Sequence, residues 1–209
     1  MTPTNPPHDC PLCPRLVAFR EEARRLHPDW HNAPVPNWGD TSPRLIIVGL
    51  APGLKGANRT GRPFTGDYAG DLLYATLQKS GLAKGDYEMR PDDTLALQGT
   101  LIANAVRCVP PENKPTPLEI KTCRQFLVAT IEKAAPRAFL ALGRIAHESL
   151  LRTLGLKLAA HPFAHGAEHQ LEGATLFDSY HCSRYNTNTG VLTTEMFEDV
   201  VGRAARAIA

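Results

Sequence analysis

Four of the five cysteines are spaced like ligands of a metal ion or a metal cluster. Cys10 and Cys13 form a C-x-x-C pair near the N-terminus, while Cys108 and Cys123 lie much further along the chain. Thiolates two residues apart chelate one metal or cluster, and two more thiolates from another element would complete four ligands. The second pair is not C-x-x-C, which counts against a zinc ribbon. The spacing alone does not separate zinc from iron–sulfur.

A glycine-rich loop at 49–67, GLAPGLKGANRTGRPFTGD, has the composition of a ligand-binding loop. Glycine allows positive φ and close approach of a ligand to the backbone. Arg59 and Arg62 could contact phosphates, and Phe64 is a candidate platform on which a base could stack. The structural alternative makes Asp67 a helix N-cap and Phe64 a core residue. The loop lacks the pattern GxxxxGK followed by Ser or Thr, so we expect no nucleotide-triphosphate site.

Single polar groups mark two further loops. Asn104 lies within an apolar run, where its amide offers a donor and an acceptor and suits the edge of a pyrimidine, although a structural network is the more common role. His181 ends another apolar run, where we expect a side chain that faces a ligand. After it, Arg184 could reach a phosphate, and Tyr185 could wedge into a base stack.

Four apolar runs predict the strands that position these loops: 44–50, 100–106, 138–143 and 174–180. Continuous apolar runs are typical of strands buried on both faces of a parallel sheet. Between and around them lie five helical patterns: 13–26, 67–82, 117–134, 143–155 and 193–209. Thr116 and Glu119 predict a capping box at the start of the third helix.

The alternation of strands and helices predicts an α/β fold, a three-layer α/β/α sandwich with a central four-stranded, mainly parallel sheet. Ligands of such folds bind at the carboxyl ends of the strands. The three polar loops follow the first, second and fourth strands, so we expect them to meet at that edge.

The composition is that of an ordinary globular protein. With 209 residues, 43% of them hydrophobic and 21% charged, we expect a single domain over 1–209. The formal net charge of +2 gives no bulk indication of nucleic-acid binding, which would need local basic clusters. No apolar run approaches the roughly 20 residues of a membrane span, and the N-terminus lacks a signal-peptide pattern. We therefore expect a cytoplasmic protein with reduced cysteines.

Together these motifs resemble the uracil-DNA glycosylase superfamily, especially its iron–sulfur members called family 5. The resemblance covers nearly the whole chain, and it is specific because several long motifs occur in the same order: C-x-x-C at 10–13, the loop 49–67, NAVRCVPPENKP at 104–115, Cys123, and HCSRYNTNTGVLT at 181–193. It implies hydrolysis of the N-glycosidic bond of uracil, and of other damaged bases, after the nucleotide is flipped out of DNA.

The resemblance also implies a cofactor. This is a 4Fe-4S cluster on Cys10, Cys13, Cys108 and Cys123, with a cluster-binding segment at 8–30 and Cys182 left as a non-ligand. Hydrolysis gives a cluster no redox task, so we expect it to join the N-terminal segment to the sheet. Cys182 stands where this loop of the family has proline, a difference that bears on the rigidity of the loop.

Roles for individual residues follow from the same resemblance. Family 4 carries a carboxylate near the first turn, but this chain has Leu50 and Ala51 there, which favours family 5 and transfers water activation to Asp67. His181 would stabilise the departing base, and Asn113 would be a second water ligand. We expect base contacts from Gly49, Ala51, Phe64, Asn104 and His181. We expect DNA contacts from Arg59, Arg62, Lys114, Ser183, Arg184 and Tyr185.

Two alternatives stay open: a family 4-like enzyme restricted to uracil, and a non-catalytic iron–sulfur module that binds nucleic acid. We expect the partner to be DNA that contains uracil or other damaged bases, with no membrane association, and the protein to be a monomer. Seven histidines are assigned structural or solvated positions: His8, His27, His31, His147, His161, His165 and His169.

Overall fold

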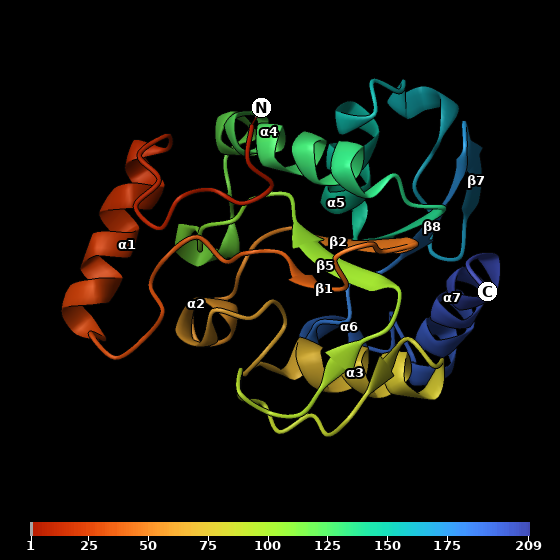
Figure 1. Cartoon of the computed structure of the whole chain (residues 1–209), viewed down its shortest axis with the longest axis horizontal. Coiled ribbons are helices and arrows are strands. Elements are labelled where there is room, and N and C mark those ends of the chain that lie inside the picture. Colours follow the sequence, from red (N-terminus) through yellow and green to blue (C-terminus); the bar gives the residue numbers. More distant parts are fainter. Residues whose placement is uncertain (1) are drawn as a thin grey trace.

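A six-stranded sheet forms the centre of the protein, whose computed structural model describes residues 2–209 (Figure 1). Its strands run in the order β1-β5-β2-β6-β8-β7. Their bounds are β1 (Trp38–Gly39), β2 (Leu45–Gly49), β5 (Thr100–Asn104), β6 (Ala138–Leu142), β7 (Glu168–Leu171) and β8 (Ala174–Ser179). The inner four strands are parallel, and the two edge strands pair antiparallel to them.

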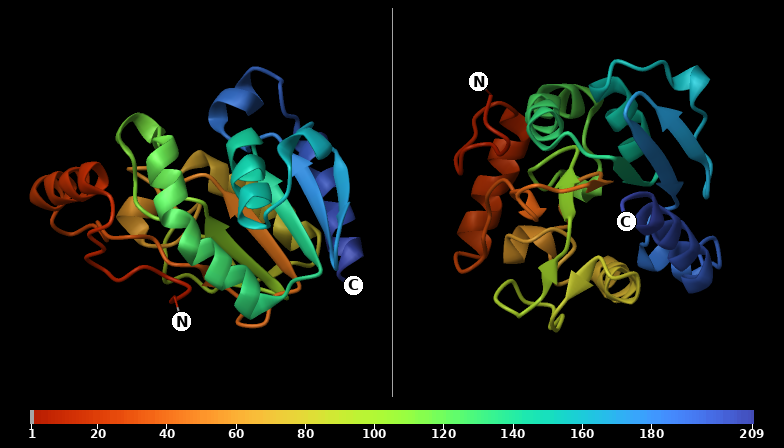
Figure 2. Two further views of the ribbon diagram at one scale, coloured as in Figure 1. Left: turned by 90° about the horizontal axis from the view of Figure 1, so that it is seen from above. Right: turned by 45° about the vertical axis from the view of Figure 1, so that its right-hand side comes forward.

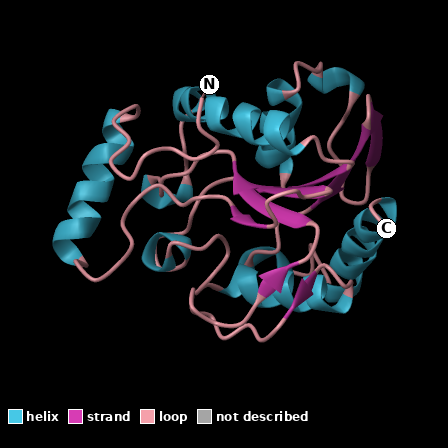
Figure 3. Cartoon of the chain, in the orientation of Figure 1, coloured by secondary structure: helices cyan, strands magenta, loops and turns pink. Residues whose placement is uncertain are grey.

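Helices cover both faces of the sheet and give a three-layer sandwich (Figure 3). α4 (Pro117–Ala134) and α5 (Arg144–Thr153) pack on one face, and α3 (Tyr68–Lys79) and α7 (Thr194–Ala207) pack on the other. α1 (Pro14–Leu26) lies outside these layers at one end of the molecule (Figure 2). The smaller elements are α2 (Ala57–Thr60), α6 (Arg184–Asn188), the hairpin β3 (Ala83–Lys84) and β4 (Ala96–Leu97), and 3-10 turns at Pro111–Asn113 and Leu158–Ala160.

Strand β2 shows why the sheet is covered on both faces. All five of its residues are buried. Successive side chains of a strand point to opposite faces, so Leu45 and Ile47 pack towards α3 and α7, while Ile46 and Val48 pack towards α4 and α5. A strand of this kind needs apolar residues at every position, which is the pattern that the sequence shows.

The predicted α/β fold with a mainly parallel sheet is confirmed, but the sheet has six strands and not four. The four predicted strands are the inner ones. β1 has only two residues, and β7 (sequence EHQL) alternates between exposed and partly buried positions without an apolar run. Edge strands bury less side-chain surface than central strands, so their sequences carry a weaker signal.

The third predicted helix begins and ends as expected. Thr116 Oγ1 accepts a hydrogen bond from the amide of Glu119 at 3.2 Å, and Glu119 Oε2 accepts one from the amide of Thr116 at 2.7 Å. This reciprocal pair is the predicted capping box. Within residues 2–209, no helix combines the length and apolarity needed to cross a membrane.

Candidate active site

A cavity of about 600 Å³ opens at the carboxyl ends of the parallel strands. Its walls come from the loop after β2, the end of β5, the 3-10 turn after β5 and the loop after β8. The predicted residues that line it are Ala51, Phe64, Asp67, Asn104, Asn113, His181, Ser183 and Arg184. The structure therefore brings the three polar loops together at the edge where the topology placed them.

Phe64 and Asn104 form the inner wall of this cavity, and Gly49 packs against both of them. A Cβ added to Gly49 would lie 2.5 Å from Asn104 Oδ1 and 2.8 Å from Phe64 Cζ, so only glycine fits there. Asn104 is 3% exposed, and its Oδ1 has no hydrogen-bond partner among the described residues. Leaving a buried acceptor unpaired costs about 1–3 kcal/mol. A ligand that donates a hydrogen bond to Oδ1 would remove that cost.

The ring of Phe64 faces the histidine of the fourth-strand loop. The two ring centroids are 5.9 Å apart, and the planes are inclined by 29°. The backbone of Phe64 has φ of 52°, a left-handed conformation that is unusual for a bulky residue and that places its ring between Gly49 and His181. Phe64 is 8% exposed and packs in the hydrophobic core, and its ring also lines the cavity. The stacking role stays a prediction.

Asp67 directs its carboxylate into the space that two glycines leave. A Cβ added to Gly56 would lie 2.3 Å from Asp67 Oδ2, and one added to Gly53 would lie 3.2 Å from it. Asp67 occupies the N-cap position of α3, but its side chain makes no capping hydrogen bond, and its buried Oδ1 has no partner among residues 2–209. Burial raises the pKa of Asp67, and the nearby amides of Gly70 and Ala69 partly oppose that rise.

His181 faces the same cavity as a neutral imidazole. Burial lowers the pKa of His181 to about 4, because an imidazolium ion would lose its hydration there. The backbone around it is fixed by Asn186, whose Nδ2 donates to the carbonyl oxygen of His181 at 2.9 Å. A neutral imidazole offers one N–H donor and one acceptor.

Cys182, beside this histidine, is a buried packing residue. It is fully buried, and its Sγ lies 3.5 Å from the carbonyl oxygen of Ala69 in α3. Burial raises the pKa of Cys182 to about 12, so the thiol is not ionised near neutral pH. Packing against the first turn of α3 therefore positions this loop without a proline.

The short helix α6 carries exposed residues at the rim of the cavity. Ser183 caps it by accepting a hydrogen bond from the amide of Asn186 at 3.3 Å. The guanidinium of Arg184 lies 5.2 Å from the ring centroid of Tyr68. Tyr185 is 74% exposed. Arg184 and Tyr185 are therefore exposed to a macromolecule that binds over the cavity.

Of the other residues predicted to contact water or DNA, Asn113 lines the cavity, whereas Lys114 and Arg59 do not. Asn113 lies at the rim of the cavity in a left-handed conformation, with φ of 57°. Lys114 is exposed, does not line the cavity and lies 3.6 Å from a carboxylate oxygen of Glu112. Arg59 is also exposed, and it borders a separate hollow beside Trp30.

Arg62 corrects one of the sequence predictions. It is 3% exposed, and its two terminal nitrogens each donate to a carboxylate oxygen of Asp93 at 2.7 Å. Its guanidinium also lies 4.8 Å from the ring centroid of Trp38. The prediction that Arg62 contacts a phosphate is wrong, because the charge is already paired and buried. Its partner is remote in sequence, so the loop alone did not reveal the pair.

Lys55 and Tyr68, whose side chains are polar and which the sequence analysis did not select, also line the cavity. Lys55 lies in the glycine-rich loop between Gly53 and Gly56. Its place in that loop was the sequence signal that could have identified it as a cavity residue. Tyr68 directly follows Asp67, and its hydroxyl lies 3.2 Å from Oγ1 of Thr187, which joins α3 to α6.

The four candidate ligand cysteines line one small apolar cavity at the end of α1. They come from the N-terminal segment, the loop after β5, and α4, and they pack with Leu16, Val106 and Phe126. Burial, together with the charges of the neighbouring thiols, raises the pKa of Cys13 to about 11 and that of Cys108 to about 12.

Among residues 2–209, one set of three potential metal-ligand atoms lies within 4.8 Å of one another, and it is formed by His147, His169 and Asp178. The four cysteines are free thiols and do not belong to this set.

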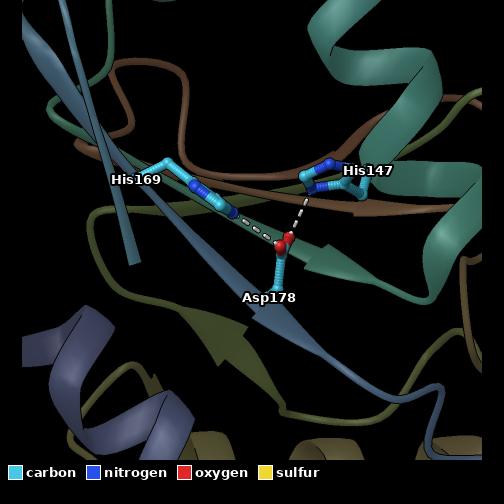
Figure 4. Close-up of side chains that lie close together, drawn as sticks. All are labelled: His147, His169 and Asp178. Carbon is cyan, nitrogen blue, oxygen red and sulfur yellow. Dashed lines mark hydrogen bonds and ion pairs between the residues drawn. The ribbon is translucent and has the colours of Figure 1, made fainter. Parts of the chain in front are cut away.

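The histidine–aspartate set has a structural role (Figure 4). Asp178 in β8 is fully buried, with His147 Nδ1 at 2.8 Å and His169 Nε2 at 3.0 Å from its two carboxylate oxygens. His147 Nε2 lies 2.9 Å from the carbonyl oxygen of His161. Both oxygens of the buried carboxylate thus have partners, and the set joins β8 to α5 and β7.

The fold and the cavity define a class of protein. This is an α/β sandwich with a cavity at the carboxyl edge of its parallel strands, and the cavity is lined by polar and ionisable side chains. That is the usual architecture of a ligand-binding enzyme. The family model described as "Uracil DNA glycosylase superfamily" matches residues 36–204. This chain belongs to the uracil-DNA glycosylase superfamily.

Known relatives support the resemblance to family 5. The chain is 49% identical over 205 residues to a Type-5 uracil-DNA glycosylase of Thermus thermophilus, covering 94% of this chain and 93% of the relative. It is 41% identical over 201 residues to a Type-5 uracil-DNA glycosylase of Pyrobaculum aerophilum, covering 94% and 88%. A Type-4 uracil-DNA glycosylase of Thermotoga maritima is 38% identical over 109 residues, covering 52% of this chain and 49% of the relative.

Proposed function

We propose that this protein removes uracil from DNA by hydrolysing the N-glycosidic bond between the base and the sugar. The observation that carries the proposal is the cavity, where a neutral imidazole and a partly buried carboxylate line the same space as an aromatic ring and an amide oxygen that has no partner among residues 2–209. The relatives named uracil-DNA glycosylase over nearly the full length support the reaction type.

Base recognition in this proposal uses the inner wall. The target atom is hidden in a duplex, so the nucleotide must rotate out of the stack into the cavity. Phe64 would stack on the flipped base, and the amide of Asn104 would read its edge, with Oδ1 accepting from a ring N–H. Gly49 leaves the base room to reach both groups.

His181 would stabilise the leaving group. As the bond breaks, negative charge collects on the base oxygens, and a donor placed there lowers the barrier. Because burial keeps His181 neutral, it would act by donating a hydrogen bond rather than by delivering a proton.

Asp67 would act on the attacking water and on the sugar. A carboxylate whose pKa is raised by burial is a better base towards water than an exposed one. It would orient and deprotonate the attacking water and oppose the positive charge that develops on the sugar. Asn113, at the rim, would be a second ligand of that water.

Contacts to the DNA backbone would come from Arg59, Lys114, Ser183 and Arg184, with Tyr185 filling the gap left by the flipped base. Arg62 is no longer part of this set. Binding that depends on such cations weakens as salt rises. Since the substrate is genomic DNA, we place the protein in the cytoplasm with the nucleoid, and we expect a monomer.

The direct test is base release from a panel of duplexes that carry uracil, hypoxanthine, xanthine or ethenocytosine. Release of uracil supports the proposal, whereas binding without any release would make the protein a non-catalytic module. The small apolar Ala51 in the cavity wall favours a substrate range beyond uracil. Release of uracil alone would instead favour a family 4-like specificity.

We also propose that Cys10, Cys13, Cys108 and Cys123 hold a 4Fe-4S cluster. The residues fit such a group: four free thiols from three parts of the chain line one apolar cavity, and cysteine thiolates are the usual ligands of iron–sulfur clusters. When bound, the cluster would serve as a structural cross-link and take no part in hydrolysis. It would join the N-terminal segment to β5 and α4.

Replacing one ligand tests this cofactor. We expect Cys13→Ser to lose the visible sulfur-to-iron absorbance and most of the bound iron, and to melt at a lower temperature because one anchor of the segment is gone. Cys182→Ser, in a cysteine outside the cavity of four, should keep its iron. A Cys13→Ser protein that stays brown with full iron content would contradict the assignment.

A further inference from the structure

Two buried arginines lie beside the four cysteines. Arg107 is 1% exposed, directly precedes Cys108 and lines the same cavity as the thiols. Arg20 of α1 is 3% exposed, and its Nη1 donates to the carbonyl oxygen of Cys10 at 3.2 Å. The reaction at the active site uses neither residue.

Among the described residues, the guanidinium of Arg107 makes only long hydrogen bonds, and its partners are neutral. Its guanidinium nitrogens lie 3.3 Å from Oδ1 of Asn5, 3.5 Å from the carbonyl oxygen of Thr4 and 3.4 Å from Oγ1 of Thr130. In the part of the chain that the structure describes, no carboxylate lies within 4.0 Å of it. Arginine stays charged in proteins, so this position holds a buried cation without an anion.

Arg20 is only slightly better matched. Its Nε is buried without a hydrogen-bond partner among residues 2–209. The nearest carboxylate oxygen belongs to Glu21, 3.8 Å away, and that side chain is 54% exposed. An exposed, mobile carboxylate at that distance offsets little of the desolvation cost of a buried guanidinium.

Both arginines lie against the candidate ligands. The backbone amide of Arg107 donates to Cys123 Sγ at 3.4 Å, and Arg107 lines the cavity of the four thiols. Nη1 of Arg20 donates to the carbonyl oxygen of Cys10. Each buried guanidinium would gain an anionic partner if the thiols were bound as thiolates.

We propose that Arg107 and Arg20 are the fixed positive counter-charges of an anionic metal–thiolate group held by Cys10, Cys13, Cys108 and Cys123. The inference rests on the proposed cofactor and names two residues that would set its reduction potential. Positive charge near a cluster favours the reduced, more negative state, so these arginines raise its reduction potential. They also make the emptied site costly, because loss of the cluster leaves two unpaired buried cations.

A purely mechanical role for Arg107 makes a different prediction. Through Thr4, Asn5 and Thr130 it also links the N-terminal segment to α4. Lysine at this position keeps the charge but lacks the planar fork, whereas methionine keeps the apolar stem and removes the charge. If charge matters, the two substitutions differ, and if only the linkage matters, they behave alike.

The experiment uses the full chain, purified anaerobically, as wild type, Arg107→Met, Arg107→Lys, Arg20→Met and Arg20→Lys. Arg25→Met is the control, since Arg25 lies on α1 with its side chain 67% exposed. For each protein we would measure iron per chain, the rate of iron loss to a chelator, and the reduction potential by protein-film voltammetry.

We expect both methionine variants to show a more negative potential and faster iron loss, and both lysine variants and Arg25→Met to stay near wild type. If an Arg107 variant fails to fold, the Arg20 pair carries the same comparison. Methionine variants with wild-type potential and iron retention, or lysine variants that match them, would overturn the counter-charge role. A wild-type protein without iron would instead refute the cofactor.

Discussion

His181 shows how burial alone determines the chemical state of a residue in this cavity. An ordinary histidine changes charge near neutral pH, but the low pKa of His181, about 4, keeps it neutral across the physiological range. A neutral donor suits a leaving group that departs as an anion, because the hydrogen bond strengthens as charge develops.

The buried imidazole should also make folding sensitive to acid. In the unfolded chain His181 takes up a proton near pH 6.5, whereas in the folded protein it does so only near pH 4. The unfolded state therefore binds more protons between these values, and the stability contribution is present above pH 6.5 and is lost as the pH falls towards 4.

We expect the free energy of unfolding of the wild type to fall between pH 7 and pH 5 by more than that of His181→Asn. Urea titrations at the two pH values measure both proteins. His165→Asn is a useful comparison, since burial also lowers the pKa of His165. Equal losses in the wild type and His181→Asn would contradict the assignment of a buried neutral ring.

At the scale of elements, the loop after β2 depends on a buried ion pair. Arg62 bonds to both carboxylate oxygens of Asp93, from the segment that leads into β4. Burial would raise the pKa of Asp93, but the hydrogen bonds from Arg62 hold it at about 2. The pair therefore fixes the end of the loop that presents Phe64 and Asp67 to the cavity.

We expect Arg62→Met to lower the free energy of unfolding by about 3–5 kcal/mol, because it leaves a buried carboxylate unpaired. Arg90→Met is the matched control: Arg90 is 53% exposed and pairs with surface carboxylates, so its loss should cost less than about 1 kcal/mol. Denaturant titration measures both. The salt dependence of DNA binding should be the same for Arg62→Met as for wild type, and a shallower dependence would restore Arg62 to the phosphate contacts.

Helix α6 presents Tyr185 to the outside, and we predict that it supports base flipping from a duplex. Tyr185→Ala should slow uracil release from double-stranded DNA at least tenfold, because nothing fills the gap in the stack, and should change release from single strands much less. Val191→Ala, in an exposed apolar residue beyond α6, provides a control. An equal slowing on both substrates would mean that Tyr185 acts on the pocket and not on the stack.

The sequence predicted the elements whose signals are local. The inner strands need apolar residues at every position, and the capping box of α4 is formed by residues three apart, so both were visible. The pair between Arg62 and Asp93 was not, since it joins two loops that only the folded chain brings together. The short edge strand β1 was missed for a similar reason, because its position depends on pairing with β5.

For the whole molecule, the topology explains why the candidate site could be assembled from sequence. Residues that follow different parallel strands meet at one edge of the sheet, so the cavity gathers Phe64, Asp67, Asn104 and His181 from three loops. The second site, of four cysteines, lies where the N-terminal segment meets the end of β5 and α4. The fold thus separates the candidate catalytic cavity from the proposed structural cluster.

In the proposed reaction Asp67 activates the water that releases uracil from the sugar. The most direct test is the single-turnover rate of uracil release from a duplex, measured with saturating enzyme for wild type and Asp67→Asn, together with the affinity of each for the same DNA. Asp86→Asn, on an exposed loop outside the cavity, is the control. We predict that Asp67→Asn slows release at least a hundredfold, binds DNA within about threefold of wild type and leaves the control unaffected. Release by Asp67→Asn at the wild-type rate would contradict the account.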